Sequence, residues 1–156
     1  GHVIVKDSGR SCSCGRKGCL ETYVSAKGMI RTVTSLIAEF NSYKGSLLDL
    51  PISDLNAKMI TELAGSGDEI AKKALTLTGQ ILGKALANMV ALFNPEHIYL
   101  AGGLTHAGQL LLIPTCQSFE EHLLNVYPDK ILIENSKFKD DEGAILGASA
   151  LIWQLN

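Results

Sequence analysis

The sequence has no excess of charge of either sign and no long uninterrupted apolar run. Its 156 residues carry 14 Lys and Arg against 16 Asp and Glu, a net charge of −2. Nucleic-acid-binding domains typically show a strong basic patch, and the cations here are scattered, so the charge pattern excludes an electrostatic footprint for nucleic acid. Gly, Asn or Lys breaks every apolar run well before the roughly 20 residues that span a bilayer. We therefore expect no membrane span.

The chain also has few cysteines and no recognisable export signal. Four cysteines in 156 residues do not make a disulfide scaffold, which is short and rich in cysteine. We therefore expect a reducing, cytoplasmic setting and one domain. Residues 1–5 read as the end of a strand already under way, which indicates a fragment whose upstream part is missing. The alternative is that the Gly-His pair remains from a tag.

Three of the four cysteines nevertheless gather in one short segment, and a histidine precedes them. These residues are His2, Cys12, Cys14 and Cys19. Three sulfurs and one imidazole form the ligand set of a closed tetrahedral zinc site. Gly15 and Gly18 can take positive φ, which lets a tight loop fold around an ion. The pattern predicts a structural zinc site.

Two other interpretations of the cysteines stay open at this point. They could be free thiols, or they could form disulfides with Cys116. Arg16 and Lys17 favour the zinc interpretation, because nearby positive charge stabilises thiolates over thiols. Cys116 is expected to be a small buried hydrophobic residue, as free cysteines commonly are.

Strands and helices are expected to alternate along the chain. Apolar, β-branched runs predict strands at residues 3–5, 98–100 and 131–133. Helical periodicity predicts a helix at 21–40 that Gly28 interrupts, and a helix that Pro114 limits, followed by another at 117–126. Capping residues predict three more helices: 55–63 after Ser53 or Asp54, 69–93 after Asp68, and 144–154 after Asp140 or Asp141. This alternation indicates an α/β fold with a largely parallel sheet.

Small residues punctuate the long helix at 69–93 and the turn that follows the strand at 98–100. Gly79 and Gly83 lie in the helix and would allow a strand, a second helix or a ligand to pack very close. Gly102 and Gly103 follow the strand, where glycines let the backbone approach a nucleotide or phosphate. A plain turn explains them as well.

Glu21 follows the cysteine cluster and begins the expected helix at 21–40. A carboxylate in a first helical turn is favoured by the helix dipole. The functional alternative is a hydrogen bond to a polar ligand whose pocket the zinc loop shapes. The other histidines, His97, His106 and His122, have no ligand spacing around them and are expected to be surface residues or caps.

The motifs together resemble the ROK family of repressors, open reading frames and kinases. The pair Gly1-His2 followed by the spacing Cys12-x-Cys14-Gly15-x-x-Gly18-Cys19-x-Glu21 is similar to that family's zinc signature. Later segments look like the family's C-terminal blocks in their usual order: residues 77–83, 93–98, 101–104 and 143–148. The resemblance covers nearly the whole chain.

The resemblance implies a fold and a set of site residues. The fold is α/β, the C-terminal lobe of an actin/hexokinase-like (ribonuclease H-like) ATPase fold with a zinc-binding loop at 2–19; residues 1–156 would be a partial C-terminal lobe of a ROK-type sugar kinase. Zinc would be held by His2, Cys12, Cys14 and Cys19. His2 and Glu21 would bind the sugar, and Gly102 and Gly103 would lie under the nucleotide.

The resemblance also implies a function for the parent protein: ATP- and magnesium-dependent phosphorylation of a hexose or N-acetylhexosamine, of the glucokinase type. The family's phosphate loop and catalytic aspartate are absent, so the fragment alone is expected to be inactive. The alternative is the ligand-sensing domain of a ROK-type transcriptional repressor, which binds DNA only through an upstream helix-turn-helix domain. A third interpretation is a zinc-stabilised interaction domain. A homo-oligomer is expected.

Overall fold

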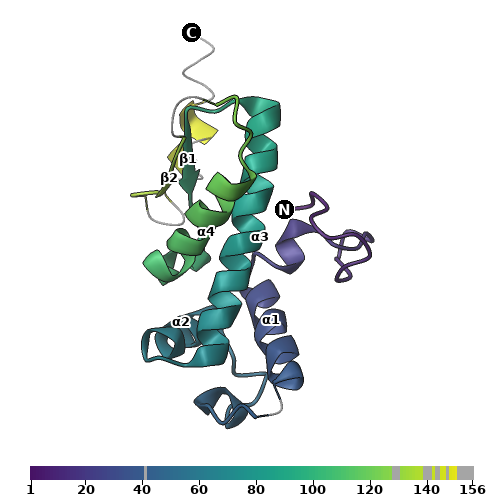
Figure 1. The fold of residues 1–156 in the computed structure, drawn as a ribbon. Coiled ribbons are helices and arrows are strands. Elements are labelled where there is room, and N and C mark those ends of the chain that lie inside the picture. Colours follow the sequence, from purple (N-terminus) through teal and green to yellow (C-terminus); the bar gives the residue numbers. More distant parts are fainter. Residues whose placement is uncertain (41, 128–130, 139–141, 143–144, 147, 151–156) are drawn as a thin grey trace.

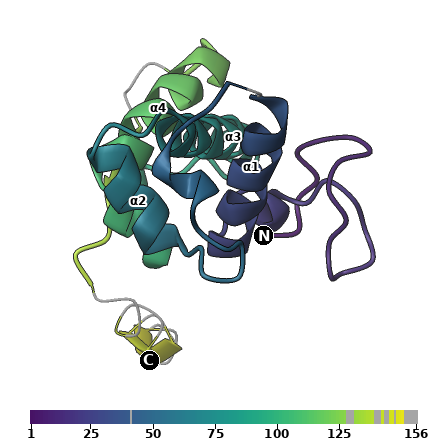
Figure 2. The same ribbon diagram turned by 90° about the horizontal axis from the view of Figure 1, so that it is seen from below.

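The computed structural model of the chain describes residues 1–40, 42–127, 131–138, 142, 145–146 and 148–150. Its elements, in chain order, are η1 (Leu20–Thr22), α1 (Ala26–Glu39), η2 (Ser46–Leu48), α2 (Ala57–Gly65), α3 (Glu69–Phe93), β1 (His97–Leu100), η3 (Gly103–Ala107), α4 (Gln109–His122) and β2 (Leu132–Asn135). Figure 1 shows α3 as the central axis, with α1 and α2 along one half and α4 with the strands along the other. The first 19 residues protrude to one side as a loop, also visible in Figure 2.

Helix α3 begins and ends where the sequence predicts. The side chain of Asp68 accepts a hydrogen bond from the backbone N–H of Ala71 at 2.9 Å, which caps the first turn. Asn94 ends the helix in the left-handed conformation, with φ of 43°. By length and composition alone α3 could cross a membrane, but half of its most apolar window is buried inside the fold. It is packed as a core helix.

The small residues of α3 allow α4 to pack directly on its backbone. A Cβ atom added at Gly79 would lie 2.8 Å from Pro114 Cγ, and one added at Gly83 would lie 2.7 Å from the Phe119 nitrogen and collide with the carbonyl oxygen of Thr115. Ser118 fastens the crossing by donating from its hydroxyl to the Gln80 carbonyl at 2.9 Å. Of the three partners that the sequence allowed at Gly79 and Gly83, a strand, a second helix or a ligand, the structure therefore shows a second helix.

Two apolar clusters lie along α3, one on each half. The first joins α1, α2 and the first half of α3, and its fully buried members include Met29, Val33, Ile60, Ala64, Ala71 and Leu75. The second joins the end of α3 to α4 and the sheet, through Leu86, Ala87, Val90, Phe119 and Ile133. The long helix thus ties the region beside the protruding loop to the sheet.

Strands β1 and β2 form a parallel pair, with His97 opposite Leu132 and Leu100 opposite Asn135. Helix α4 is part of the connection between them, and it packs on α3. The predicted strands at 98–100 and 131–133 are thus confirmed to within two residues at their ends. The mixed α/β class with a parallel sheet is confirmed as well.

Two predictions about the segment after β1 were wrong. Pro114 does not limit a helix but lies inside α4, and the separate helix expected at 117–126 is the second half of α4, which ends at His122. Proline removes one backbone donor and ordinarily kinks a helix. Here its ring lies against Gly79 of α3, so the helix that continues through the proline is packed directly on a neighbouring helix.

Three predictions in the first half also differ from the structure. No strand forms at 3–5, where only Ile4 makes an isolated bridge, to Cys19. The helix expected from residue 21 begins at Ala26 after a Ser25 cap, and Gly28 lies inside its first turn without interrupting it. The cap of α2 is Asn56 rather than Ser53 or Asp54. The caps proposed at Asp140 and Asp141 and the ends of the last helix lie outside the described residues.

Candidate metal centre and adjacent pocket

The protruding loop is held in shape by backbone hydrogen bonds between its two ends. Val5 N–H donates to the Gly18 carbonyl at 2.9 Å, and Leu20 N–H donates to the Val3 carbonyl at 2.8 Å. Gly18 has φ of 76°, and a Cβ there would collide with the Lys6 carbonyl. These bonds pair residues 3–5 with the other end of the loop rather than with a strand of the sheet.

The loop brings all four predicted metal ligands together. One ligand atom from each of His2, Cys12, Cys14 and Cys19 lies within 4.8 Å of all the others. Cys12 Sγ is 3.6 Å from His2 Nδ1, and Cys14 Sγ is 3.6 Å from Cys19 Sγ. Tetrahedral zinc with its usual Zn–S and Zn–N bond lengths separates its ligand atoms by about 3.3–3.8 Å. The donor set fits a zinc ion, since two of its separations fall in this range and all of its atoms lie within 4.8 Å of one another.

The cysteines are not paired in disulfides: all four are free. Their environments differ in the two halves of the cluster. A hydrogen bond from the backbone N–H of Arg16, and then the Arg16 side chain, lower the pKa of Cys14 to about 6. Burial raises the pKa of Cys19 to about 11. The Arg16 contacts thus favour the thiolate of Cys14, whereas burial favours the thiol of Cys19.

His2 connects the cysteine cluster to Glu21. Its Nδ1 faces Cys12, while its Nε2 lies 3.6 Å from Glu21 Oε2. The carbonyl of His2 accepts a 2.8 Å hydrogen bond from Arg16 Nη2, which fixes the backbone beside the ring. Glu21 lies in η1, two residues after Cys19, and its side chain is 50% exposed. The carboxylate is thus open to a ligand on the side away from the cysteines.

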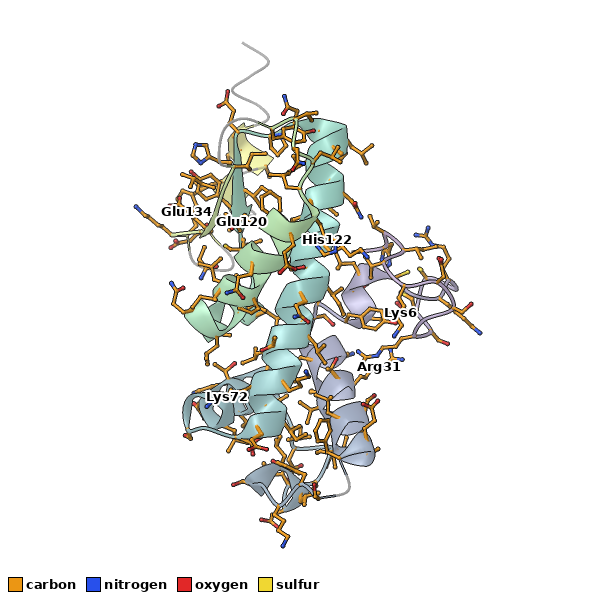
Figure 3. The ribbon with its side chains drawn as sticks, in the orientation of Figure 1. Lys6, Arg31, Lys72, Glu120, His122 and Glu134 are labelled. Atoms are coloured by element: carbon orange, nitrogen blue, oxygen red, sulfur yellow. The ribbon has the colours of Figure 1, made fainter. Side chains whose placement is uncertain are left out.

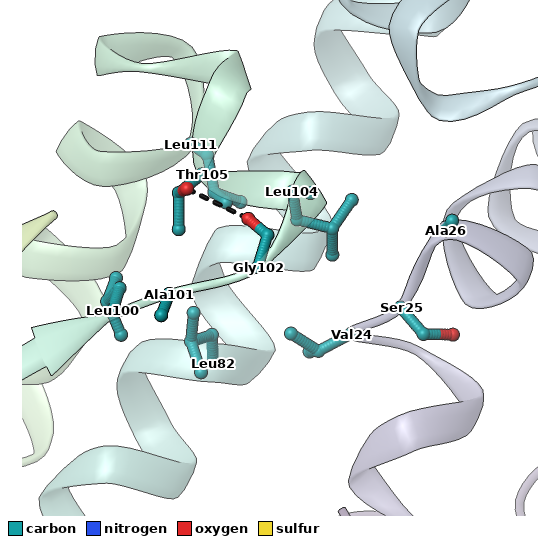
Figure 4. A pocket seen from close by; sticks show the side chains of 11 residues that line it. Val24, Ser25, Ala26, Leu82, Leu100, Ala101, Gly102, Leu104, Thr105 and Leu111 are labelled. Atoms are coloured by element: carbon teal, nitrogen blue, oxygen red, sulfur yellow. Dashed lines mark hydrogen bonds between the residues drawn. The ribbon is translucent and has the colours of Figure 1, made fainter. Parts of the chain in front are cut away.

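Gly102 and Gly103 form one edge of a pocket of about 330 Å³. Figure 4 shows Gly102 and Leu104 on one side, Val24 and Ser25 on the other, and Leu82 of α3 below Ala101 and Gly102. The Thr105 hydroxyl donates to the Gly102 carbonyl at 2.8 Å and holds the turn. Gly102 has φ of 102°, and the space where a Cβ would stand is open at both glycines. The turn therefore exposes its backbone toward a ligand-sized space.

A second pocket, also about 330 Å³, shares Gly103 with the first and extends toward α2. Its lining is more polar: Lys58, Thr61 and Glu62 come from α2, and His106 comes from η3. The sequence indicated only a surface or capping role for His106, because nothing in its spacing shows that η3 faces α2. Gly103 thus lies between an apolar and a polar hollow, which suits a ligand with both kinds of surface.

Other residues considered in the sequence lie away from this centre. His97 stacks on Tyr99 with ring centroids 6.0 Å apart, and His122 Nδ1–H donates to the Ser118 carbonyl at 2.8 Å near the end of α4. Cys116 is half-buried beside the second apolar cluster, where burial raises the pKa of its thiol. None of the three takes part in the metal centre.

Comparison with known proteins places this fold and site in a family. The profile of the ROK family matches residues 1–154. The chain belongs to the ROK family.

Its relatives include both enzymes and regulators. The glucokinase of Halalkalibacterium halodurans is 34% identical over 151 residues, which cover 94% of this chain and 45% of that protein. The DNA-binding transcriptional dual regulator NagC of Escherichia coli K12 is 30% identical over 97% of this chain and 36% of its own length. The chain thus spans less than half the length of these relatives.

Solved structures agree with the fold. A ROK family glucokinase from Streptomyces griseus, in complex with glucose and AMPPNP, superposes with a TM-score of 0.81 at 26% identity, over 92% of this chain and 47% of that one. A ROK family transcriptional regulator homologous to the Escherichia coli MLC protein superposes with a TM-score of 0.76 at 30% identity, over 88% of this chain and 34% of that one. The fold is therefore a ROK fold, of the actin/hexokinase-like type.

Proposed function

We propose that this chain is the zinc- and sugar-binding C-terminal lobe of an ATP-dependent sugar kinase of the glucokinase type. The observation that carries the proposal is the arrangement around His2, with one ring nitrogen toward three cysteines and the other toward Glu21. A ligated histidine is ordinarily oriented by a hydrogen bond to its second nitrogen. Here a half-exposed carboxylate lies 3.6 Å from that nitrogen, beyond hydrogen-bond distance, and it is a strong acceptor for sugar hydroxyls.

In this proposal zinc is structural and does no chemistry on the substrate. His2, Cys12, Cys14 and Cys19 would fill all four positions of a tetrahedral ion, which leaves none open for a substrate. The ion would join the start of the chain to η1 and thereby hold the His2 ring beside Glu21. The Nε2 atom of His2 and the carboxylate of Glu21 would then bind neighbouring hydroxyls of a hexose or N-acetylhexosamine.

The two hollows at Gly103 are the proposed nucleotide site. The apolar one, lined by Leu82 and Leu104, suits a flat base or ribose face, and the polar one offers Lys58 and Thr61. The exposed backbone of Gly102 and Gly103 lets a phosphate approach without meeting a side chain. In the full-length protein, magnesium would neutralise charge on the transferred phosphoryl group.

The general base is not among the residues that surround this site. The family's phosphate loop and catalytic aspartate have no counterpart in the sequence, so phosphoryl transfer has nothing here to activate the sugar hydroxyl. We expect the 156-residue chain to bind zinc and, weakly, sugar, and to show no sugar-dependent ATP consumption. An assay coupled to ATP consumption with a panel of hexoses tests this; turnover by the chain alone would contradict it.

The first testable prediction concerns Glu21. In the full-length protein, Glu21→Gln should weaken sugar binding by roughly 1.5–3 kcal/mol, because it removes a charge-assisted acceptor with little change in volume. Zinc content and the thermal midpoint should stay the same. Glu121→Gln, an exposed carboxylate on α4, is the matched control. Calorimetric titration with glucose and N-acetylglucosamine measures both, and an unchanged affinity in Glu21→Gln would return Glu21 to a helix-start role.

The second candidate function is sugar sensing in a transcriptional repressor. It is favoured by the regulators that match this chain at 30% identity over nearly its whole length. The sugar and zinc sites proposed above would be the same, and the difference lies outside the chain. Phosphorylation of a bound hexose by the full-length protein supports the kinase; sugar-dependent release of DNA without phosphorylation supports the repressor.

We also propose that the chain self-associates and works in the cytoplasm. Leu92 and Phe93, at the end of α3, are each 77% exposed, and Val3 and Ile4 are about half exposed. Apolar surface of this kind is commonly covered in an assembly, most simply a symmetric dimer. The free cysteines suit a reducing compartment. Light scattering of the purified chain tests the association, and a stable monomer would contradict it.

A further inference from the structure

A half-buried arginine, Arg10, lies where the protruding loop meets the helical body. Its Nη1 donates to the carbonyl oxygens of Thr22 and Gly28, both at 2.9 Å, and its Nη2 donates to Thr32 Oγ1 at 3.0 Å. Its guanidinium carbon lies 4.6 Å from the centroid of the Tyr23 ring. The acceptors belong to η1 and α1, so a single side chain joins the loop to two elements.

The main chain of Arg10 is held equally firmly. Its N–H donates to the Tyr23 hydroxyl at 3.0 Å, and its carbonyl accepts from the Gly18 N–H at 2.8 Å. Arg10 stands two residues before Cys12, and Gly18 stands one residue before Cys19. These bonds therefore fix the two ends of the segment that carries the thiols.

The guanidinium is kept in this place at an electrostatic cost. Burial, and then the positive charge of Arg31, lower the pKa of Arg10. Arg31 itself makes a looser contact with the loop, donating from Nη1 to the Ser11 carbonyl at 3.2 Å in an exposed position. In Figure 3 Arg31 points from α1 toward the loop and Lys6 lies on the loop itself. The tight acceptors of Arg10 distinguish it from its cationic neighbours.

We propose that Arg10 is a positioning residue that sets the distance between the segment carrying Cys12 and Cys14 and the η1 segment carrying Cys19 and Glu21. It would thereby pre-organise the metal centre and place the carboxylate beside His2. This inference rests on the proposed function, because it assumes that the four ligands hold zinc and that Glu21 binds sugar. The side-chain contacts of Arg10 given above are with Thr22, Tyr23, Gly28 and Thr32 rather than with a metal ligand or Glu21, so it acts through the segments that carry those residues.

The arrangement of the acceptors requires a guanidinium, with N–H donors on two nitrogens, rather than the single nitrogen of an ammonium group. Three acceptors, Thr22 O, Gly28 O and Thr32 Oγ1, are reached at once by the planar guanidinium. A lysine ammonium keeps the charge but cannot span all three from one nitrogen. A pocket of about 400 Å³ lies against Arg10, so water can reach acceptors that a shorter side chain leaves unpaired. Replacing Arg10 should therefore loosen the loop without unfolding α3 and α4.

The experiment compares Arg10→Met, Arg10→Lys and, as the matched control, Arg31→Met in the 156-residue chain. Zinc affinity is measured by competition with a chelator, and the thiolate-to-metal absorption of the cobalt-loaded chain reports the geometry of the site. Loss of a supporting contact to a metal site typically costs about 10-fold in affinity, and we expect that for Arg10→Met. Arg10→Lys should fall between wild type and Arg10→Met, and Arg31→Met should match wild type.

A second readout separates this inference from the proposed function. Hydrogen exchange is measured at the amides of Gly18 and Glu21, which bond across the loop, and at amides within α3. Arg10→Met should lose protection at the loop amides while α3 keeps its own. If the wild-type chain binds no zinc, the proposed metal centre fails, and the exchange pattern still decides the role of Arg10.

The results that would overturn the inference are specific. Unchanged zinc affinity together with unchanged loop protection in Arg10→Met would show that the side chain positions nothing. Full recovery in Arg10→Lys would replace positioning by a simple charge effect. If Arg10→Met does not fold, Thr32→Val removes one acceptor at constant volume and should weaken zinc binding by a smaller factor than the Arg10 change; an affinity equal to wild type would overturn the role.

Discussion

The metal loop and the α3–α4 crossing are stabilised in opposite ways. In the loop, exposed backbone segments are held by a few specific side chains, and the metal ligands come from positions as far apart as His2 and Cys19. In the crossing, the backbones of two helices are in contact at Gly79 and Gly83. Each of the surrounding apolar residues adds only a small part of the stabilising free energy. The loop depends on the identity of single residues, while the crossing depends on the absence of side chains.

This difference predicts how each region fails. Removing a ligand should open the loop locally, because its neighbours bury little apolar surface. Adding one methyl group at the crossing should disturb the whole molecule, because α3 connects both apolar clusters.

The largest effect is expected from Gly83→Ala. The added Cβ would meet backbone atoms of α4, including the Phe119 nitrogen at 2.7 Å, and two helix backbones cannot move apart without opening the second apolar cluster. Overpacking of this kind typically costs about 1–3 kcal/mol, and we expect a value near the top of that range. Denaturant unfolding followed by circular dichroism measures it.

Gly65→Ala is the matched control for the helix-propensity part of that change. It stands at the end of α2 with nothing within 4 Å of the added Cβ, so it should be neutral or stabilise by up to about 1 kcal/mol. Equal destabilisation by both substitutions would show that contact with α4 does not limit Gly83.

The second effect is expected from removing zinc, or from Cys12→Ser. A ligand that binds only the folded state stabilises it by about 2.7 kcal/mol when its free concentration is a hundred times the dissociation constant. Chelation or Cys12→Ser should remove that increment and the loop protection, and leave the α3 and α4 signals in place. Cys116→Ser, half-buried outside the loop, should keep one zinc per chain by metal analysis. Collapse of α3 on chelation would contradict the separation of the two regions.

The two regions also differ in what the sequence predicts about them. The spacing of His2 and the cysteines predicts a cluster, and the structure brings those four side chains together, because ligand chemistry is local and residue-specific. The capping of α3 by Asp68 is likewise predictable from its side chain. Whether a cluster binds zinc or a carboxylate binds sugar remains a proposal.

Long-range packing accounts for what the sequence did not predict. Pro114 is a helix breaker by its own chemistry, and its place against Gly79 of α3, where α4 continues through it, depends on packing that its own sequence segment does not show. Arg10 has no distinctive spacing, because its acceptors are backbone carbonyls and a hydroxyl 12 to 22 residues away. The β-branched residues Val3, Ile4 and Val5 favour a strand, but whether a strand forms depends on a pairing partner, which the local sequence does not indicate.

The smallest effect is expected from Tyr43→Phe, at a contact that lies outside both the metal loop and the α3–α4 crossing. The Tyr43 hydroxyl donates to Asp68 Oδ2 and accepts from the Leu47 N–H at 3.2 Å, so it supports the carboxylate that caps α3. Loss of one such bond should cost about 1 kcal/mol near neutral pH. Burial, and then the bond to Asp68, raise the pKa of Tyr43 from 10.0 to about 12.

The sign of the pH dependence follows from that raised pKa. The folded chain holds the Tyr43 proton more tightly than the unfolded chain, so the contribution is complete below pH 10 and declines as the pH rises toward about 12. Wild type should therefore lose stability faster than Tyr43→Phe over this interval, and the difference between the two should shrink. Unfolding free energies of both proteins at several pH values between 8 and about 12 measure it. A constant difference across that interval would show that Tyr43 and Asp68 are not coupled in the folded chain.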